Sequence, residues 1–535
     1  MSTDEKSLEQ VLWDSANVMR QTMGAADYMN YALGLIFYKH LSDKTLEAAA
    51  NALVDAGEVE AQDVATEEAR QAVYKKYYDA EEFHEDLLET MNMDYEIKPD
   101  FTFAALMDSI RKQTFQLENL NQAFRDIEQS NPDLLGHLFD DVDLYSTKLG
   151  STPQKRNDMI AQVMTALAPL NLDSHSGDVL GDAYEYLIGT FASDMGQKAG
   201  EFYTPQSVSQ LLTHIVTWGQ EAKKGFSAYD PAMGSGSLLL NVRHYIQDVD
   251  SIAYYGQEIK TSTYNLARMN MIIHGIAATN QHLRNADTLD RDWPSDEVTN
   301  FDGVMMNPPY SQHWSADKGF ESDPRFSDYG VLAPKSKADY AFLLHGLYHL
   351  KESGTMGIVL PHGVLFRGAA EGKIRQKLLE KGYIYAVIGL PAGIFYSTGI
   401  PTIIMVLKKD RPGRDVLFID GSQEFEKGKA KNTLTQANIQ KLFQAYTDRK
   451  DVDKFAHVAS FEEIQENDFN LNIPRYVDTS EPEPEIDLGE VNREMADTNH
   501  QIQAAEKELA AMMEELTTDD PKKAKNLQDL LRLFQ

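Results

Sequence analysis

The sequence predicts a doubly wound, Rossmann-like α/β domain at residues 171–478, between an α-helical N-terminal domain at residues 1–170 and a helical tail at residues 479–535. Three observations lead to this prediction. Before about residue 170 the apolar residues recur at helical spacing. After Gly200 short apolar runs alternate with helical segments, and a long stretch near the end lacks both glycine and proline.

In the N-terminal region, residues 11–43 form the longest helical pattern, with Gly24 and Gly34 as its weak points. Shorter amphipathic stretches follow at residues 103–114 and 159–167. A bundle of such helices only needs to pack or to bind partners. By itself it predicts no chemistry.

The central region has six strand candidates, at residues 227–230, 253–256, 301–306, 357–360, 386–390 and 402–407. Helices are expected between several of them, at residues 236–246, 262–274 and 340–351. In such sheets ligands bind beyond the carboxyl ends of the strands. Polar residues that follow the strands are therefore the candidate site.

Near the end of the chain, residues 480–485 read as a polar linker interrupted by proline. Residues 491–516 should form one long helix, and Asp520 and Pro521 should separate it from a last helix through Leu527 and Leu533.

Composition narrows the class of protein. At 535 residues, with 42% hydrophobic residues, the chain should hold two or three globular domains. No apolar run approaches the ~20 residues that cross a bilayer, and the polar, acidic start is unlike a secretory signal, so we expect a cytoplasmic protein without a membrane anchor. Cysteine is absent, which excludes thiolate zinc sites and covalent cysteine catalysis. The net charge of −33 should repel nucleic-acid phosphates unless basic residues cluster locally.

The first candidate site is the loop at residues 230–237, which follows a strand and opens a helix. Its small residues Gly234, Ser235 and Gly236 let the backbone approach a ligand, and Asp230 can accept hydrogen bonds from amino or hydroxyl groups. The loop lacks both the lysine of a phosphate-binding loop and the three-glycine dinucleotide fingerprint. It therefore suits a nucleoside without a pyrophosphate, the alternative being a plain strand-to-helix turn.

Two further carboxylates follow this loop. Glu258 ends the next strand candidate, where it can hold both ribose hydroxyls of a nucleoside; its alternative is a strand-end or capping acid. Asp287 precedes a later strand and can meet the exocyclic amine of an adenine ring, or it is an ordinary loop acid.

The most specific motif is Asn307-Pro308-Pro309-Tyr310, at the end of a hydrophobic strand candidate. The prolines stiffen the backbone and leave its carbonyls free to accept. The Asn307 amide oxygen and the Pro308 carbonyl can together take both hydrogens of an amino group, which directs the nitrogen lone pair toward an electrophilic methyl. Tyr310 can stack on the ring that carries this amino group. A rigid structural turn is the alternative.

On DNA, this chemistry leaves only exocyclic amino nitrogens as targets, because methylation at carbon 5 of cytosine needs a cysteine nucleophile. The target base lies inside a duplex and has to be flipped out.

With these motifs in hand, the sequence resembles the methylation subunits of type I restriction-modification systems, which are gamma-class adenine-N6 DNA methyltransferases. Trp13, Asp14, Arg20 and residues 33–43 are similar to the family's N-terminal domain, and residues 200–205 are similar to its cofactor segment. The order of this segment, the glycine-containing loop and Asn307 to Tyr310 is that of the gamma class.

The resemblance implies S-adenosyl-L-methionine as cofactor, with residues 171–478 as the catalytic domain. Tyr203, Thr204 and Pro205 would line its methionine end and the loop with Asp230, Gly234, Ser235 and Gly236 its centre. Glu258 would hold the ribose and Asp287 the adenine. Asn307, Pro308 and Tyr310 would act on the target base. Phe395 could add a second ring, or be a core phenylalanine, and Asp339 belongs to the family's next motif or caps a helix.

The resemblance also implies partners: double-stranded DNA, a specificity subunit that joins two copies of this chain, and an endonuclease subunit. The acidic net charge argues against independent DNA binding. The roughly 125 residues after the last expected strand leave little room for a domain that reads DNA sequence. We expect the helices after Val491 to dock on the specificity subunit; a solvated helix or a self-association coil is the alternative.

Two other functions remain open on this sequence. Enzymes that methylate a glutamine side chain in proteins also use an Asn-Pro-Pro-Tyr clamp, although chain length, residues 200–205 and the helical tail disfavour them. A non-catalytic scaffold that retains a nucleoside site is the other alternative.

Overall fold

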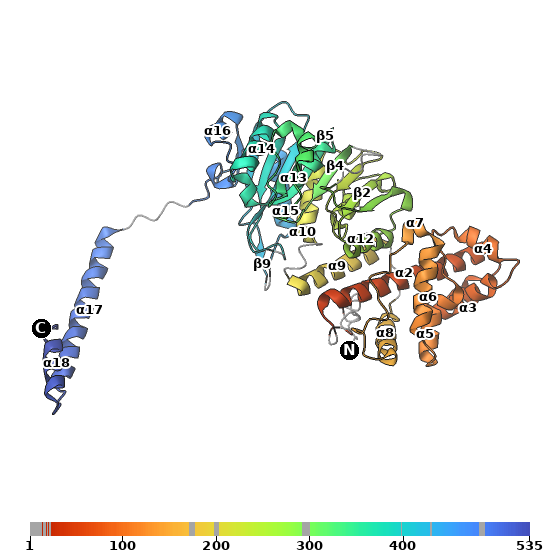
Figure 1. Cartoon of the computed structure of the whole chain (residues 1–535), viewed down its shortest axis with the longest axis horizontal. Coiled ribbons are helices and arrows are strands. Elements are labelled where there is room, and N and C mark those ends of the chain that lie inside the picture. The colour runs from red at the N-terminus through yellow and green to blue at the C-terminus, as the bar shows by residue number, and fades with distance from the viewer. Residues whose placement is uncertain are drawn as a thin grey trace. The chain divides into compact units, whose positions relative to one another are not determined.

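The computed structural model describes residues 13, 18 and 20 and the ranges 23–170, 177–196, 203–290, 300–396, 398–428, 431–480 and 487–534. It divides into two compact units, residues 1–478 and 479–535. Figure 1 shows the α/β fold with helices before and after it, which confirms the predicted fold class.

The N-terminal region is helical, and its central element is the long helix α2 (Ala25–Asp55), which contacts several of the others. Leu35, Phe37 and Leu41 of α2 are fully buried in the largest apolar cluster of this region. The remaining elements are α3 (Glu67–Tyr78), α4 (His84–Met91), α5 (Phe103–Arg111), α6 (Leu117–Ser130), α7 (Pro132–Leu135) and α8 (Pro153–Leu167), with 3-10 turns at Ala61–Val64 and Pro99–Phe101.

The helical pattern predicted over residues 11–43 is interrupted at Gly24, one of its two expected weak points. Gly24 is extended and caps α2, which begins at Ala25, and residues 11–22 lie mostly outside the described part. Gly34 does lie inside the helix, where a Cβ would overlap the Val142 side chain. Close packing, not a break, therefore accounts for this glycine.

The central domain is built on one sheet of nine strands within the described residues, in the order β11-β8-β6-β7-β5-β4-β1-β2-β3. The strands are β1 (Ser227–Asp230), β2 (Ala253–Glu258), β3 (Gln281–Asn285), β4 (Phe301–Met306), β5 (Leu350–Pro361), β6 (Ile384–Gly389), β7 (Thr402–Lys408), β8 (Val416–Asp420) and β11 (Ala456–Ala459). All run parallel except β7 and β11. A separate ribbon joins β9 (Glu426–Lys427) to β10 (Asn432–Thr433).

All six predicted strands are present, but the expectation that the sheet ends at residues 402–407 is wrong. Strands β8 and β11 follow in the same sheet, and β3 is an additional strand that contains Asn285. Strand β3 was missed because its residues are polar and half-exposed at the sheet edge.

Helices cover both faces of the sheet. One apolar cluster joins it to α10 (Gln206–Thr217), α11 (Ser237–Asn241), α12 (Thr261–Ile273) and α15 (Gln436–Asp448). The cluster on the other face includes α13 (Asp339–Tyr348), α14 (Ala369–Glu380) and α16 (Phe461–Glu466). Burial on both faces explains why most strands read as continuous apolar runs. Further 3-10 turns lie at Val242–His244, Val249–Ser251, Ala278–Asn280, Lys318–Ser322, Ser327–Tyr329, His362–Leu365 and Ile473–Arg475.

Helix α9 (Gly177–Met195) lies between the helical region and the sheet domain and contacts both α2 and α12. At its end, Phe191 packs against the Trp13 ring, with 5.5 Å between ring centroids, and Asp194 pairs with Arg20 at 3.1 Å. Asp14 lies outside the described residues.

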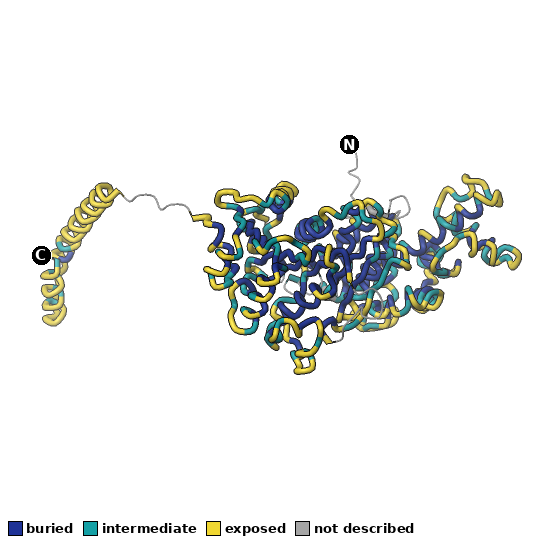
Figure 2. Tube along the Cα trace, turned by 90° about the horizontal axis from the view of Figure 1, so that it is seen from above, coloured by how far each residue is buried: buried dark blue, intermediate teal, exposed yellow. Residues whose placement is uncertain are grey.

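The last unit consists of α17 (Leu488–Glu514) and α18 (Pro521–Leu531), which confirms the two predicted helices. Most of the predicted linker lies outside the described residues. Figure 2 shows α17 exposed along almost its whole length. Within the described residues, no helix has the length and apolar character needed to cross a membrane.

Arg268 of α12 fastens the sheet domain to the helical region. Its guanidinium donates to the carbonyl oxygens of Gly136 at 3.0 Å and Leu134 at 2.6 Å, and the side chain is buried. Arg268→Ala leaves these carbonyls without their donor, so we expect the free energy of unfolding in urea to fall by about 2–4 kcal/mol. Arg125→Ala, on the exposed face of α6, is the control and should change little. Equal effects of the two substitutions would contradict the expectation.

Candidate functional site

The candidate site lies where three strands end side by side. Strand β1 pairs with β2 on one side and with β4 on the other, all in parallel. Asp230 is the last residue of β1, Glu258 is the last of β2, and Asn307 directly follows β4. Strand order changes direction at β1, which is the position where open α/β sheets form a ligand crevice.

Asp230 is a buried carboxylate that is only half satisfied. Its Oδ1 accepts a hydrogen bond from the Ala232 amide at 2.9 Å, while Oδ2 has no hydrogen-bond partner among the described residues. Burial, followed by the nearby charge of Glu258, raises the pKa of Asp230 well above its usual range. Such an orphaned acceptor is costly in a folded chain unless a ligand meets it.

The loop after Asp230 depends on its glycines. Gly234 and Gly236 have φ angles of 55° and 84°, which side chains rarely adopt. The Gly234 amide donates to Glu258 Oε2 at 3.2 Å, and the Lys260 amide donates to Oε1 at 2.8 Å. Burial raises the pKa of Glu258. Both of its oxygens keep a further lone pair.

Two cavities meet at this edge. The first, here called the wide cavity, has a volume of about 380 Å³ and is lined by residues that include Glu258, Asp287 and Pro309. The second, here called the narrow pocket, is lined by residues that include Tyr203, Thr204, Asp230, Gly234 and Ser235. Ala232 and Asn307 line both.

Seven of the nine predicted cofactor residues thus line one of the two cavities. Pro205 and Gly236 line neither. Pro205 is the N-cap of α10, and Gly236 is the N-cap of α11, close to Ala267 of α12. Residues 200–202 of the predicted segment lie outside the described residues.

The Asn307 amide is held at both ends. Its Nδ2 donates to Thr204 Oγ1 at 3.1 Å, and the Tyr310 hydroxyl donates to its Oδ1 at 2.7 Å. Burial, with the charge of Asp339, raises the pKa of Tyr310, so its hydroxyl keeps its proton. Pro308, the residue after Asn307, is buried. The sequence did not reveal that Thr204 and Tyr310 orient this amide.

Two residues whose roles the sequence left open have defined contacts. Asp339, the first residue of α13, accepts from the Ser311 amide at 2.8 Å and from Arg367 at 3.0 Å. It thereby anchors the backbone directly after Tyr310. Phe395 is 4% exposed and belongs to the core, where its ring meets the Tyr310 ring edge-on at 6.2 Å.

Sequence reasoning missed Glu185 of α9, which lies behind the loop. Its Oε2 accepts from the Ser237 hydroxyl at 2.6 Å, and its Oε1 accepts from Asn270 Nδ2. Glu185 is 4% exposed, and burial raises its pKa to about 7. The available signal was a single acid inside the apolar run of residues 183–188.

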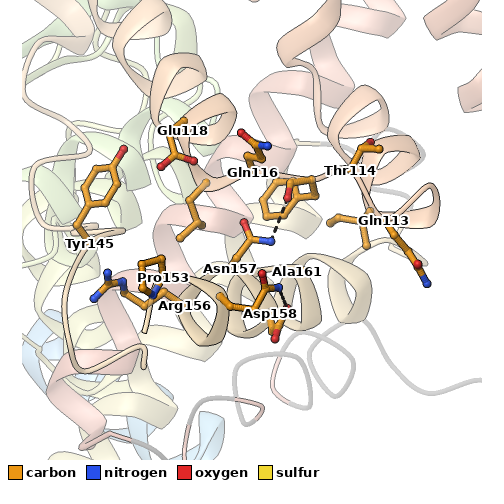
Figure 3. Close-up of a pocket in the computed structure, with 14 residues that line it drawn as sticks. Gln113, Thr114, Gln116, Glu118, Tyr145, Pro153, Arg156, Asn157, Asp158 and Ala161 are labelled. Carbon is orange, nitrogen blue, oxygen red and sulfur yellow. Dashed lines mark hydrogen bonds between the residues drawn. The ribbon is translucent and has the colours of Figure 1, made fainter. Parts of the chain in front are cut away.

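Another opening lies far from these residues, in the helical region. It measures about 680 Å³ and is lined by the end of α5 and the starts of α6 and α8 (Figure 3). Asn157 there donates to the Phe115 carbonyl, and Gln154 donates to Asp158, so these side chains are engaged with the protein itself. None of the predicted site residues lines this opening.

Comparisons with known proteins agree on one family. The profile of a family described as N-6 DNA Methylase matches residues 175–485, and that of the HsdM N-terminal domain matches residues 8–167. The MpnII methylase subunit of a type I restriction enzyme from Mycoplasma pneumoniae is 35% identical over 539 residues, 96% of each chain. The MjaVIII methylase subunit from Methanocaldococcus jannaschii is 34% identical over 394 residues, 71% of this chain and 66% of that one.

Solved structures show the same likeness. The crystal structure of a type I restriction-modification methyltransferase subunit from Streptococcus thermophilus is 60% identical, with a TM-score of 0.85 over 88% of this chain and 99% of that one. A modification subunit from Vibrio vulnificus shares the fold at 18% identity, with a TM-score of 0.60 over 90% of this chain and 99% of that one.

Because only one oxygen of the Asp230 carboxylate has a partner among the described residues, we predict that replacing this residue stabilises the protein. Asp230→Asn removes a buried charge, so without ligand we expect the free energy of unfolding at pH 7 to rise by about 1–3 kcal/mol. Because the folded chain holds the Asp230 proton more tightly than the unfolded chain does, acidification favours wild-type folding at this residue. The advantage of the variant should therefore shrink as the pH falls. Urea unfolding at pH 7 and pH 5 measures both effects.

Asp302, also fully buried in the sheet, is the matched control. Burial alone would raise its pKa, but hydrogen bonds from Lys223 and Lys351 hold the pKa of Asp302 below its usual value. Asp302→Asn should therefore destabilise the chain. A loss of stability in both variants would contradict the interpretation of Asp230 as an unmatched acceptor.

Proposed function

Because this chain belongs to the N-6 DNA methylase family, among the methylase subunits of type I restriction enzymes, we propose that it transfers a methyl group from S-adenosyl-L-methionine to N6 of a flipped-out adenine in DNA. The observation that carries this proposal is the position of the Asn307 amide, at the end of β4 and on the border of both cavities.

The residues of the two cavities fit the cofactor. Asp230 lines the narrow pocket, and its buried Oδ2 has no hydrogen-bond partner among the described residues, which suits the ammonium group of a methionine. Glu258 has a lone pair left on each oxygen for the two ribose hydroxyls, and Asp287 lines the same wide cavity for the adenine. The cofactor, when bound, supplies an electrophilic methyl.

The chain's own contribution is to hold the target amino group. The Asn307 Oδ1 accepts from Tyr310, which leaves its second lone pair for a hydrogen of the adenine N6 amine. Thr204 fixes the opposite end of the amide, so the oxygen stays directed at the site. The Pro308 carbonyl oxygen accepts a hydrogen bond from the second hydrogen of the amine. Localising the nitrogen lone pair in this way needs positioning rather than a strong base.

A base inside a duplex cannot reach Asn307, so we infer that the adenine turns out of the helix. Tyr310 then offers its ring as a stacking surface, and the edge-on contact with Phe395 holds that ring in place. In this arrangement Phe395 supports Tyr310 from the core.

Reading of the DNA sequence falls to a separate specificity subunit. The net charge of −33 opposes independent DNA binding by this chain. We propose that the specificity subunit joins two copies of this chain, that an endonuclease subunit joins for restriction, and that the assembly works in the cytoplasm.

The tail offers a surface for this assembly. Its exposed apolar residues recur at intervals of three, four and seven, the spacing of a coiled-coil seam: Leu488, Val491, Met495, Ile502, Leu509, Met512 and Leu516. Such a seam, left open on α17, suits a helix of the specificity subunit.

Methylation of a glutamine side chain in a protein is the competing reaction, since it uses the same amide clamp. The match to a methylase subunit over 96% of both chains favours DNA. Incubation of the assembled complex with labelled cofactor, DNA and total protein separates the two. Label in protein but not in DNA would sink the proposal.

Asn307→Ala should abolish methylation of DNA in the assembled complex, at least about 1,000-fold, because no side chain then accepts the amine hydrogens. Cofactor binding should change less than about threefold, since the residues assigned to the cofactor are unchanged in this variant. Asn119→Ala, on the exposed face of α6, is the control. Full activity of the Asn307 variant would favour the scaffold alternative.

Deletion of residues 480–535 should abolish co-purification with the specificity subunit and leave residues 1–478 folded, because they form a compact unit of their own. A sharper variant, Ile502→Glu with Leu509→Glu, should weaken assembly by about tenfold or more. His500→Glu with Lys507→Glu adds at least as much negative charge outside the seam and should assemble normally. Unchanged assembly of the deletion would refute the docking role.

A further inference from the structure

We propose that Glu185 is a positioning residue that determines, through Ser237, which way the Ser235 hydroxyl faces in the narrow pocket. This inference rests on the proposed cofactor. It assigns a role to a buried acid that lies about 50 residues before the loop in sequence and behind it in space.

Three oxygen atoms form a continuous chain from α9 to the pocket. Ser237 Oγ lies 2.6 Å from Glu185 Oε2, and Ser235 Oγ lies 2.9 Å from Ser237 Oγ. Ser235 and Ser237 both line the narrow pocket. All three side chains are more than nine-tenths buried.

The direction of the hydrogen bonds that link these three oxygen atoms follows from the number of hydrogens available. A serine hydroxyl has one hydrogen, and a carboxylate has none. When Glu185 is ionised, Ser237 must donate to it, so the Ser235 hydroxyl must donate to Ser237. Ser235 then presents only lone pairs to the pocket.

A neutral Glu185 reverses the direction. One of its oxygens still accepts from Asn270, whose Nδ2 also donates to the Ser235 carbonyl at 3.0 Å. The other oxygen carries the proton and donates to Ser237, which frees Ser237 to donate to Ser235. The Ser235 hydrogen is then free to face the pocket.

When Glu185 is ionised, the Ser235 hydroxyl presents only acceptor lone pairs to the pocket. This suits the ammonium group of a methionine, which needs hydrogen-bond acceptors. Asp230 Oδ2, in the same pocket, is a second acceptor without a partner among the described residues. Together with Ser235 it makes an acceptor pair. A neutral Glu185 replaces one acceptor by a donor that the ammonium repels.

Helix α9 holds Glu185 in place. One turn before it, Gly181 packs so closely on the His274 ring of α12 that a Cβ would overlap the ring. One turn after it, Gly189 packs on the Tyr203 hydroxyl in the same way. The same helix carries Phe191 and Asp194, which contact Trp13 and Arg20. The polarity of Ser235 is therefore set by a helix that also contacts the N-terminal residues.

Several titratable groups surround Glu185. Asp182 and Tyr184 lie on its own helix, Tyr203 faces it from the segment before α10, and His274, directly after α12, packs on Gly181 one turn away. Burial followed by the charge of Asp182 keeps the pKa of Glu185 near 7 despite its hydrogen bonds. The carboxylate form dominates above this pH and is lost below it.

The test compares two ligands on the full chain assembled with its specificity subunit. S-adenosylhomocysteine carries the amino-acid end, and 5′-methylthioadenosine lacks it. Glu185→Gln keeps the acceptor for Asn270 and donates to Ser237, as the neutral acid does. We expect it to weaken S-adenosylhomocysteine about 10- to 100-fold in calorimetry at pH 7.5 and to leave 5′-methylthioadenosine within about twofold.

Asp182→Asn removes a charge from the same helix and is the matched control; both affinities should stay as in the wild type. Ser235→Ala should show the same selective loss as Glu185→Gln, and adding Glu185→Gln to it should cause no further loss. These variants also serve if Glu185→Gln folds poorly. Equal loss of both ligands, or additive effects, would show a merely structural role and overturn the proposal.

The pH dependence gives a second readout. Between pH 5.5 and 7.5 the ligand amino group stays mostly protonated, because such groups have a pKa of about 8. Wild-type affinity for S-adenosylhomocysteine, relative to that of Glu185→Gln, should fall as the pH drops through 7. A constant ratio would overturn the proposal. If the wild type binds neither nucleoside, the proposed cofactor itself fails.

Discussion

Strand β1 lies between β2 and β4, and this order brings the polar groups of the site together. Because the three strands run parallel, their carboxyl ends meet at one edge, and Asp230, Glu258 and Asn307 arrive there from positions far apart in sequence. Asp230 and Glu258 are both buried at that edge. Acids at the edge are thus desolvated, and they are held by backbone amides where the loop geometry allows it.

Desolvation has opposite consequences at two ends of the same sheet. Asp302 has lysine partners and a lowered pKa, as expected for a group that supports the fold. Asp230 accepts from one amide, its other oxygen has no partner in the described part of the chain, and its pKa is raised. A buried carboxylate oxygen without a partner lowers the stability of the fold, and such a loss of stability is common at functional sites.

Much of the site could be predicted from sequence because its chemistry is local. The tetrapeptide at Asn307, the glycines of the loop and the acid at Glu258 each follow an apolar run, and that pattern alone places them at strand ends. The helix lengths in the tail were equally accessible, since residues 491–516 contain no helix breaker.

Other features depend on tertiary contacts that leave no local pattern. Strand β3 is polar because it is an edge strand. The order of the strands in the sheet cannot be predicted from any single segment of the sequence. Pro205 and Gly236, which were predicted to contact the cofactor, are the N-caps of α10 and α11, a position that the sequence did not indicate. The hydrogen bond from Tyr310 to Asn307 and the one from Ser237 to Glu185 each require residues brought together by folding.

The proposed separation of catalysis from DNA recognition rests on the net charge of the chain and on the exposed apolar residues of its last unit. The net charge of −33 gives this chain little attraction for DNA, while its last unit leaves an apolar seam exposed. Under the proposed function, catalysis and DNA recognition are properties of an assembly. Methyl transfer would then require both the amide clamp and the partner that delivers the base.

The most direct measurement is co-expression of this chain with its specificity subunit in a host that lacks other adenine methylases, followed by mapping of N6-methyladenine across the host DNA. We expect methylation at one recurrent sequence motif, present only when both subunits are present. An intact complex that leaves the DNA free of N6-methyladenine would contradict the proposed function.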